Sequence, residues 1–266
     1  MDLQLQDKVV LVTAASRGLG AAAARRFAEE GARVAISARD ADRISATAQS
    51  IARDTGAEVL ALVGDVARPE AAEQMVQAVI ERWGRLDVLV INAGGPPGGP
   101  FVNLKIEQWE TAFQLTLMSA VRLCYAALPH LLKNKRPQRG AIVAITSLAV
   151  KQPVDNLLLS NSLRLAVIGM LKTLANELGP QGIRVNAIAP GWTATERVVE
   201  LMQGRAQVNG TTVEDETRKI TATIPFGRMG EPGEFADALV WLASPRASYV
   251  HGIVLPVDGG AIKASL

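Results

Sequence analysis

Short, uninterrupted apolar runs alternate with helical stretches along the chain, and this alternation constrains the fold more than any other feature. A strand that is buried on both faces shows no polar alternation, so such runs indicate a parallel sheet covered by helices on both sides. We therefore predict an α/β Rossmann fold, a doubly wound, seven-stranded, mostly parallel sheet. The runs expected to form strands are 9–12, 34–36, 59–63, 88–91, 141–145, 184–188 and 253–257.

Helical patterns fill the intervals between these runs. The expected helices are 21–30, 40–55, 69–83, about 106–132, 156–178 and 231–243, and the stretch 192–230 is expected to be irregular or short-helical. No repeat, linker or composition break interrupts the pattern, and 266 residues suit one α/β domain with a large core. The prediction is a single domain over residues 1–266.

Composition excludes several other classes of protein. Hydrophobic residues make up 48% and charged residues 20%, which is typical of a globular protein. The net charge is only +2 and the basic residues are scattered, so no nucleic-acid partner is expected. No apolar signal begins the chain and no run approaches the ~20 apolar residues of a membrane span. Cys124 is the one cysteine, which suggests a reducing, cytoplasmic location.

A glycine-containing turn follows the first strand. The segment 13–20 reads Thr-Ala-Ala-Ser-Arg-Gly-Leu-Gly and leads into an Ala-rich helix. A dinucleotide pyrophosphate needs a helix N-terminus with free N–H groups and a backbone that it can approach closely, and Gly18 and Gly20 meet that need. Ala14 stands where the first glycine of such a turn would be. Taken alone, the segment is also compatible with an ordinary tight turn.

Further motifs give this turn a family context. Gly64-Asp65-Val66, Asn92-Ala93-Gly94 and Pro190-Gly191 follow it in order, and the chain closes with 224–232 (Ile-Pro-Phe-Gly-Arg-Met-Gly-Glu-Pro) and 257–260 (Val-Asp-Gly-Gly). With these motifs the chain resembles the short-chain dehydrogenase/reductase family, and its tail resembles the 3-oxoacyl-acyl-carrier-protein reductase branch. The resemblance spans about residues 7–260.

The resemblance implies a nicotinamide dinucleotide site. Asp65 would hold the adenine amino group, Asn92 and Gly94 would line the cofactor ribose, and Thr195 would lie by the nicotinamide with Pro190 and Gly191. The family also implies that 192–224 is a substrate lid and that the chain forms a homotetramer. The cofactor-binding residues that the resemblance implies are Thr13, Ser16, Arg17, Gly18, Leu19, Gly20, Arg39, Asp65, Val66, Asn92, Ala93, Gly94, Pro190, Gly191 and Thr195.

The end of the second strand favours NADP(H) over NAD(H). An NAD-selective site usually carries an acid there to accept from the ribose 2′-hydroxyl. This strand ends Ser37-Ala38-Arg39 with no carboxylate before Asp40, and Arg17 lies in the nearby turn. Two guanidinium groups would suit a 2′-phosphate. The alternative is that both arginines are ordinary solvent-exposed side chains.

The catalytic positions implied by the resemblance hold unusual residues. Ser147, at the end of the 141–145 strand, matches the family's serine. The expected Tyr and the Lys four residues later are replaced by Ser160 and Arg164, and the asparagine position on the long helix holds Thr116. The chain is thus similar to a divergent subgroup that lacks the Tyr-X-X-X-Lys pair.

Neither tyrosine of the chain restores that pair, since the residues four places after Tyr125 and Tyr249 are Pro129 and Ile253. A serine hydroxyl has a pKa far above the ~10 of tyrosine, and a guanidinium with a pKa above ~12 does not relay protons, although Arg164 can still bond a ribose. Three other residues can border the site: Asn156, Lys151, which is more easily read as solvent-facing, and Asp155, which is more easily read as the N-cap of the following helix.

Two functions follow from these residues. The first is an NADP(H)-dependent oxidoreductase for a small carbonyl or alcohol substrate, with a reorganised or weakened proton donor. The second is a catalytically impaired nucleotide-binding protein, a sensor or scaffold. His130 and His251 are expected to be structural or surface residues, and no metal-ligand spacing is found.

Overall fold

The computed structural model describes residues 1–135 and 139–264, so the predicted domain 1–266 also includes positions 136–138 and 265–266, which lie outside the described residues. The strands are β1 (Val9–Val12), β2 (Arg33–Ala38), β3 (Val59–Val63), β4 (Val88–Ile91), β5 (Gly140–Ile145), β6 (Ile183–Pro190) and β7 (Val254–Val257). The helices are α1 (Gly18–Glu29), α2 (Ala41–Thr55), α3 (Ala71–Trp83), α4 (Ile106–Phe113), α5 (Ser119–Leu131), α6 (Leu158–Leu178), α7 (Glu196–Asn209), α8 (Val213–Thr221) and α9 (Pro232–Ala243).

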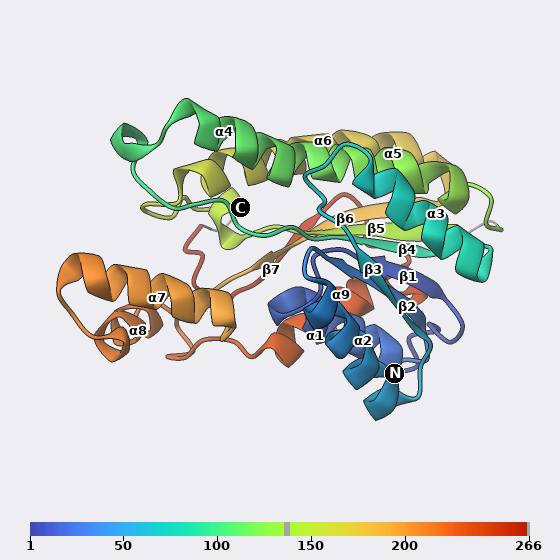
Figure 1. Ribbon diagram of the computed structural model, residues 1–266, viewed down its shortest axis with the longest axis horizontal. Helices are drawn as coiled ribbons and strands as arrows, with labels where there is room; N and C mark the ends of the chain where they lie inside the picture. The colour runs from blue at the N-terminus through green and yellow to red at the C-terminus, as the bar shows by residue number, and fades with distance from the viewer. Residues whose placement is uncertain (136–138, 265–266) are drawn as a thin grey trace.

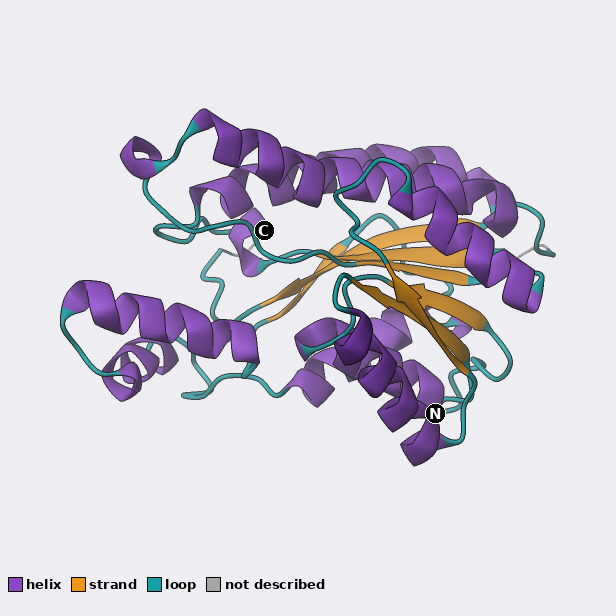
Figure 2. Ribbon diagram, in the orientation of Figure 1, coloured by secondary structure: helices purple, strands orange, loops and turns teal. Residues whose placement is uncertain are grey.

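All seven strands form one sheet in the order β3-β2-β1-β4-β5-β6-β7, and every pairing is parallel (Figure 2). The strand order reverses direction at β1, which pairs with β2 on one side and with β4 on the other. The predicted Rossmann architecture is therefore confirmed, with a sheet that is wholly parallel. A crevice opens at the carboxyl ends of the strands where the order reverses, and open α/β sheets bind their ligands there.

Helices cover both faces of this sheet, as the apolar character of the strands requires. In Figure 1, α3, α5 and α6 lie on one side and α1, α2 and α9 on the other. Each face has its own buried core: Leu123 and Leu171 belong to the first, and Phe27 and Phe235 to the second. β1 illustrates why, because Leu11 faces the first core and Val12 the second.

The long helix predicted over 106–132 has an interruption. A π-helical segment, Gln114–Met118, separates α4 from α5. Segments of this kind insert an extra residue into the helical turn and often occur at functional sites. Thr116 lies in the middle of it.

Two helical stretches, Ile106–Leu131 and Leu158–Gln181, are long and apolar enough by composition to cross a membrane. The expectation that no stretch approaches such a length was therefore wrong. The fold gives a different reason for their hydropathy, since both lie against the sheet. Leu123 and Leu131 of α5 and Leu171 and Leu178 of α6 belong to the core on that face.

The segment between β6 and α9 is more regular than predicted. It forms α7 and α8, which extend from the sheet at the left of Figure 1. Gly210 ends α7 with a left-handed φ of 63°, and a reciprocal cap between Thr212 and Asp215 begins α8. Met202, Ile220 and Ile224 form a separate small core beneath them. We refer to residues 192–224 as the lid segment.

Candidate functional site

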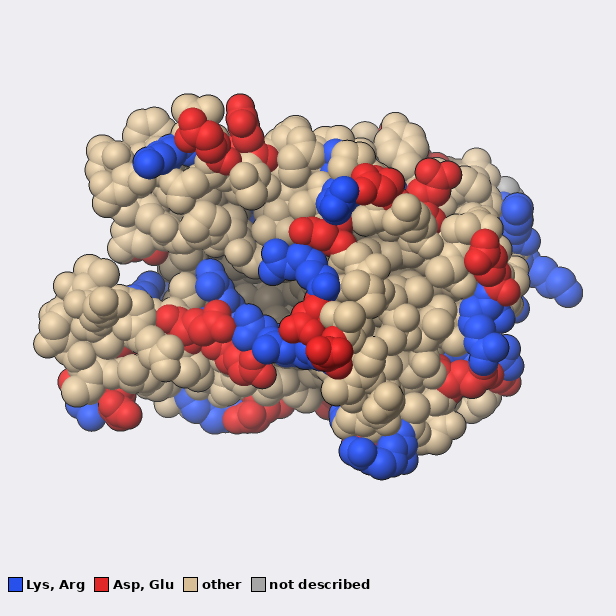
Figure 3. Space-filling model, viewed as in Figure 1, with Lys and Arg blue, Asp and Glu red and all other residues tan. Residues whose placement is uncertain are grey.

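A cavity of about 1030 Å³ opens at the carboxyl ends of the central strands. The glycine turn after β1, the loop after β4, the end of β5 and the first turn of α7 all contribute to its wall. The space-filling view shows it as a hollow whose rim carries both basic and acidic side chains (Figure 3). This is the position that the reversal of strand order marks for a ligand.

The structure brings nearly all of the sequence-predicted site residues to this cavity. Thr13 and Thr116 are the exceptions, as both are buried behind the wall. The predicted residues that line the cavity are Ser16, Arg17, Gly18, Leu19, Gly20, Arg39, Asp65, Val66, Asn92, Ala93, Gly94, Ser147, Ser160, Arg164, Pro190, Gly191 and Thr195.

Backbone geometry explains the glycine turn. Gly18 begins α1 with a φ of 58°, so the N-terminus of this helix opens into the cavity. Gly20 must be glycine, because a Cβ there would lie 2.8 Å from both the Ala14 carbonyl oxygen and Asn92 Nδ2. Ala14 has a φ of 49°, a left-handed conformation that favours glycine. The sequence position that lacks the first glycine therefore carries backbone strain.

Thr13 joins the ends of two central strands and does not face the cavity. Its hydroxyl donates to the Asn92 carbonyl at 2.7 Å and accepts from the Asn92 N–H at 2.9 Å. Asn92 Nδ2 in turn donates to the Ala14 carbonyl at 2.9 Å. These bonds hold the turn after β1 against the loop after β4, so Thr13 acts by positioning Asn92.

Arg17 forms ion pairs with two glutamates of the lid segment. Its Nη1 bonds Glu196 Oε2 at 2.7 Å and Glu200 Oε1 at 2.9 Å, both on the first turns of α7. Hydrogen bonding to Arg17 holds the pKa of the Glu196 carboxyl below its usual value. The predicted role of Arg17 toward a phosphate therefore requires exchange of these partners, a requirement that the sequence did not reveal.

Arg39 and Arg43 occupy the corner at the end of β2. Both side chains line the cavity, and Asp40 between them caps α2 by accepting from the Arg43 N–H at 2.9 Å. Sequence reasoning had identified Arg39 and missed Arg43. The signal was available, because Arg43 lies in the first turn of the helix predicted to begin at residue 40, directly after the corner that Arg39 occupies.

Ser147, Ser160 and Arg164 meet at the other end of the cavity. Ser147 lies two residues after the end of β5, and its Oγ accepts from the Ala149 N–H at 3.1 Å. Arg164 Nε donates to Ser160 Oγ at 3.2 Å, and its Nη1 donates to the Ile145 carbonyl at 3.1 Å. The i, i+4 spacing on α6 places the serine and the arginine on one helical face.

The surroundings of Arg164 lower the pKa of its guanidinium. Burial lowers the pKa of the Arg164 guanidinium to about 10, and the positive charge of Arg197 acts in the same direction. The group remains charged at neutral pH. Arg197, on the first turn of α7, also lines the cavity and was not among the predicted site residues.

Thr116 is 6% exposed, and its Oγ1 has no hydrogen-bond partner within residues 1–135 and 139–264. The other residues weighed from sequence lie apart from the cavity wall. Tyr125 and Tyr249 are 77% and 100% exposed. His251 has a structural role, since its Nδ1 accepts from the Val185 N–H at 3.1 Å.

The predicted cap of α6 was wrong. Leu157, not Asp155, holds the N-cap position, and no side chain caps the helix. The preceding Asn156 has a φ of 61°, and its carbonyl accepts from the Gly99 N–H at 2.7 Å. Pairing with the glycine-rich loop after β4 thus turns this segment and delays the start of the helix. Neither Lys151 nor Asp155 lines the cavity.

Comparisons with known proteins place the chain in context. Residues 13–261 match the family described as enoyl-(acyl carrier protein) reductase. The chain is 35% identical over 261 residues to the L-rhamnose 1-dehydrogenase (NAD(P)(+)) of Azotobacter vinelandii, covering 96% of this chain and 97% of the relative. It is 34% identical over 261 residues to the 3-oxoacyl-acyl-carrier-protein reductase FabG of Vibrio cholerae, covering 97% and 98%.

Among solved structures, the L-sorbose reductase of Gluconobacter frateurii, complexed with NADPH and L-sorbose, superposes with a TM-score of 0.93. The two chains are 33% identical, and the match covers 99% of this chain and 100% of that structure. The similarity therefore includes the lid segment as well as the sheet.

Proposed function

Since the chain belongs to the short-chain dehydrogenase/reductase family, whose members among its relatives are oxidoreductases, we propose that it is an NADP(H)-dependent oxidoreductase acting on a carbonyl/alcohol pair. The observation that carries this proposal is the single cavity that gathers the glycine turn, Asn92 and Ser147 at the strand-order reversal. Fold alone would not carry it, because one fold hosts many functions.

The cavity wall fits a dinucleotide. The N-terminus of α1 faces the cavity, where its N–H groups would suit a phosphate. Gly20 has no side chain, and a Cβ there would collide with the turn after β1 and displace it. A Cβ at Gly94 would meet nothing within 4 Å, so a ligand can approach this backbone. When bound, the cofactor would supply the hydride. The chain would hold it through Gly18, Gly20, Asp65 and Asn92.

The phosphate corner supports NADP(H). Arg39 and Arg43 line the cavity at the end of β2, where an NAD-selective site would carry an acid. Arg17 would join them if a 2′-phosphate displaced Glu196 and Glu200, because a dianionic phosphate competes well for an exposed guanidinium. The name of the Azotobacter relative includes both NAD and NADP, so cofactor choice remains part of this proposal.

The proton donor in this site would not be a tyrosine phenol. No Tyr, His, Lys or Cys lines the cavity within the described part of the chain. Ser147 and Ser160 accept hydrogen bonds through Oγ, so their hydroxyl hydrogens are free to donate to a substrate oxygen. We propose that these serines orient the carbonyl, that Arg164 fixes Ser160, and that water delivers the proton.

The same observation favours the second function. With no Tyr, His, Lys or Cys on the wall in the described part of the chain, chemistry that depends on proton transfer from a side chain would lose roughly 10²–10⁴-fold in rate. A protein that binds the dinucleotide without turnover, as a sensor or scaffold, would have this site. The serines that still face the cavity make us favour the enzyme.

The test is NADPH oxidation in the presence of a panel of aldehydes and ketones, followed by absorbance. We expect slow turnover that is lost in Ser147→Ala and strongly reduced in Ser160→Ala. Lys151→Ala is the matched control, because Lys151 lies just beyond Ser147 but not on the cavity wall. Turnover that persists in both serine variants would contradict these roles, and NADPH binding without turnover would favour the sensor.

We also propose that the protein forms a homotetramer. β7 is an edge strand of the sheet, and its residues are partly exposed. Because an uncovered edge strand is a template for association, a second copy is a suitable cover. Light scattering in solution would test this, and a monomer would contradict it.

A further inference from the structure

Two arginines at one end of the cavity wall, Arg164 and Arg197, have no close carboxylate partner among the described residues. Arg164 forms no ion pair with any described residue, and both of its protein partners, Ser160 Oγ and the Ile145 carbonyl, are neutral. A guanidinium has five N–H donors, and these contacts use two. A partly buried cation that has no counter-charge is costly, so such groups are usually paired.

Arg197 faces the same space from the lid segment. A Cβ on Gly95 would lie 3.6 Å from its Nε and Nη2, so its guanidinium lies close to the loop after β4. Its one ion pair, to Glu200, is loose at 3.6 Å. Glu200 is held more closely by Arg17, at 2.9 Å. Glu196 and Glu200 of α7 thus pair mainly with Arg17 at the nucleotide end of the cavity. In the part of the chain that the structure describes, Arg197 has no comparably close carboxylate at the other end.

The hydroxyls of Ser147 and Ser160 complete this end of the cavity. Together the four side chains offer guanidinium N–H groups and hydroxyl donors around one space. The guanidinium groups match a carboxylate, because a planar guanidinium bonds both of its oxygens, and the serine hydroxyls remain for the neighbouring carbonyl of the substrate.

We propose that Arg164 and Arg197 form a carboxylate-binding subsite, and that the substrate of this protein is an oxocarboxylate or hydroxycarboxylate. The redox reaction of such a substrate rests on the proposed function, whereas the binding of a carboxylate at this subsite does not. The lowered pKa of Arg164 is consistent with it, since part of the lowering comes from Arg197 and an anion between them would relieve that repulsion. Arg197 would also close the lid segment over the bound anion.

The experiment compares carboxylates with their neutral amides. The probes are 2-oxobutanoate, 4-oxopentanoate and phenylglyoxylate, each paired with its amide, and the readout is the unfolding midpoint as a function of probe concentration, with and without NADPH. We expect at least one carboxylate to bind 10-fold or more tightly than its amide, and added salt to weaken that preference.

Variants assign this preference to the two arginines. Arg197→Gln should weaken carboxylate binding by about 10- to 100-fold, as expected for the loss of charge-assisted hydrogen bonds, and leave amide binding unchanged. Arg218→Gln is the matched control, since it removes one positive charge from α8 of the same lid segment without touching the cavity. Arg164→Lys keeps the charge but loses the planar donor set, and should weaken binding to a smaller extent.

Equal binding of every carboxylate and its amide, or a preference that survives Arg197→Gln, would overturn the subsite. NADPH binding is recorded in the same titrations. If NADPH raises the midpoint and the carboxylates do not, the subsite fails and the proposed function stands. If NADPH has no effect and a carboxylate does, the proposed function fails and the subsite stands.

Discussion

Single residues at the glycine turn shape the part of the cavity wall where we propose that a dinucleotide binds. Ala14 adopts a φ of 49°, which costs an L-residue on the order of 1–2 kcal/mol, and the rest of the turn holds it there through the Asn92 bond to its carbonyl. The site therefore carries local strain at the point where the family has glycine.

Replacing Ala14 by glycine should relieve this strain. We expect Ala14→Gly to stabilise the protein by about 0.5–1 kcal/mol in urea unfolding, because the gain in the turn exceeds the extra entropy of the unfolded chain. Ala15→Gly is the control. Ala15 is fully buried and its φ is not positive, so that change should destabilise the protein. Destabilisation by Ala14→Gly would show that the turn is not strained.

A second residue-scale prediction concerns the catalytic end. If Ser160 and Arg164 stand where the family carries Tyr and Lys, the double change Ser160→Tyr with Arg164→Lys should raise NADPH-dependent carbonyl reduction. The expected gain is about 10²–10⁴-fold, the usual contribution of a positioned proton donor. Ser160→Tyr alone should gain less. A folded double variant with no gain would mean that the two positions do not correspond.

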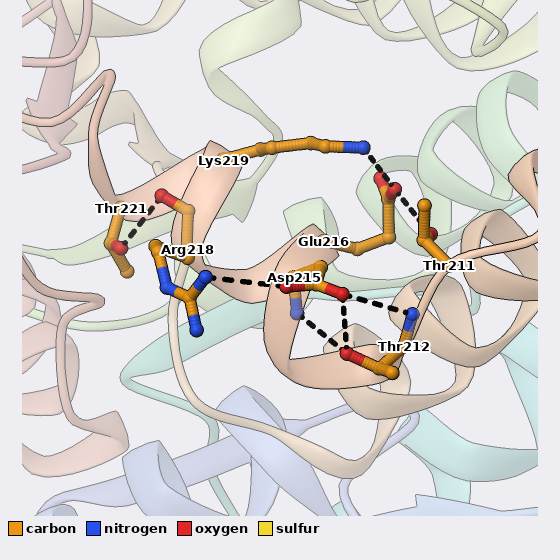
Figure 4. A network of polar contacts seen from close by, with 7 residues as sticks. All are labelled: Thr211, Thr212, Asp215, Glu216, Arg218, Lys219 and Thr221. Atoms are coloured by element: carbon orange, nitrogen blue, oxygen red, sulfur yellow. Dashed lines mark hydrogen bonds and ion pairs between the residues drawn. The ribbon is translucent and has the colours of Figure 1, made fainter.

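At the scale of elements, the lid segment depends on a buried carboxylate. Glu216 of α8 has a side chain that is only 3% exposed, and it accepts from Lys219 Nζ at 2.6 Å and from Thr211 Oγ1 at 2.7 Å (Figure 4). These hydrogen bonds lower the pKa of the Glu216 carboxyl from its usual 4.5 to about 2. The same figure shows the Thr212–Asp215 cap that begins the helix.

This pKa makes the lid segment sensitive to acid. The charged form of Glu216 stabilises the fold above pH 4.5, and that contribution is lost as the pH falls from 4.5 toward 2. We expect hydrogen-exchange protection of 213–221 to be greater in the wild type than in Glu216→Gln at pH 7, with the difference closing below pH 4.5. Glu214→Gln, at an exposed position of the same turn, should change little. A difference that persists at pH 2 would contradict the assignment.

The sequence predicted most strands and helices correctly but not every boundary between them. Continuous apolar runs such as 9–12 and 88–91 predicted strands correctly, because a strand buried on both faces is decided by its own residues. The start of α6 was missed because the long-range bond between Gly99 and Asn156 determines it. Motif spacing located Ser147, Ser160 and Arg164. The partners of Arg17 and the position of Arg197 depend on how the lid segment packs against the cavity, which local sequence does not specify.

At the scale of the whole molecule, the reversal of strand order at β1 brings distant motifs together. The turn after β1 and the loop after β4 meet because β1 and β4 are neighbours in the sheet, and α7, which follows β6, lines the same cavity with its first turn. Basic groups outnumber acids on the resulting cavity wall, which suits a ligand with phosphates at one end. We propose that this ligand is NADP(H).

Thermal unfolding with NADPH and with NADH, for the wild type and Arg39→Gln, tests that claim most directly. A ligand present at 100 times its Kd stabilises the folded state by about 2.7 kcal/mol, which for a chain of this size raises the midpoint by roughly 5–10 °C. We predict such a shift with NADPH, a much smaller one with NADH, and a reduced NADPH shift in Arg39→Gln. No shift with either nucleotide at millimolar concentration would contradict the account.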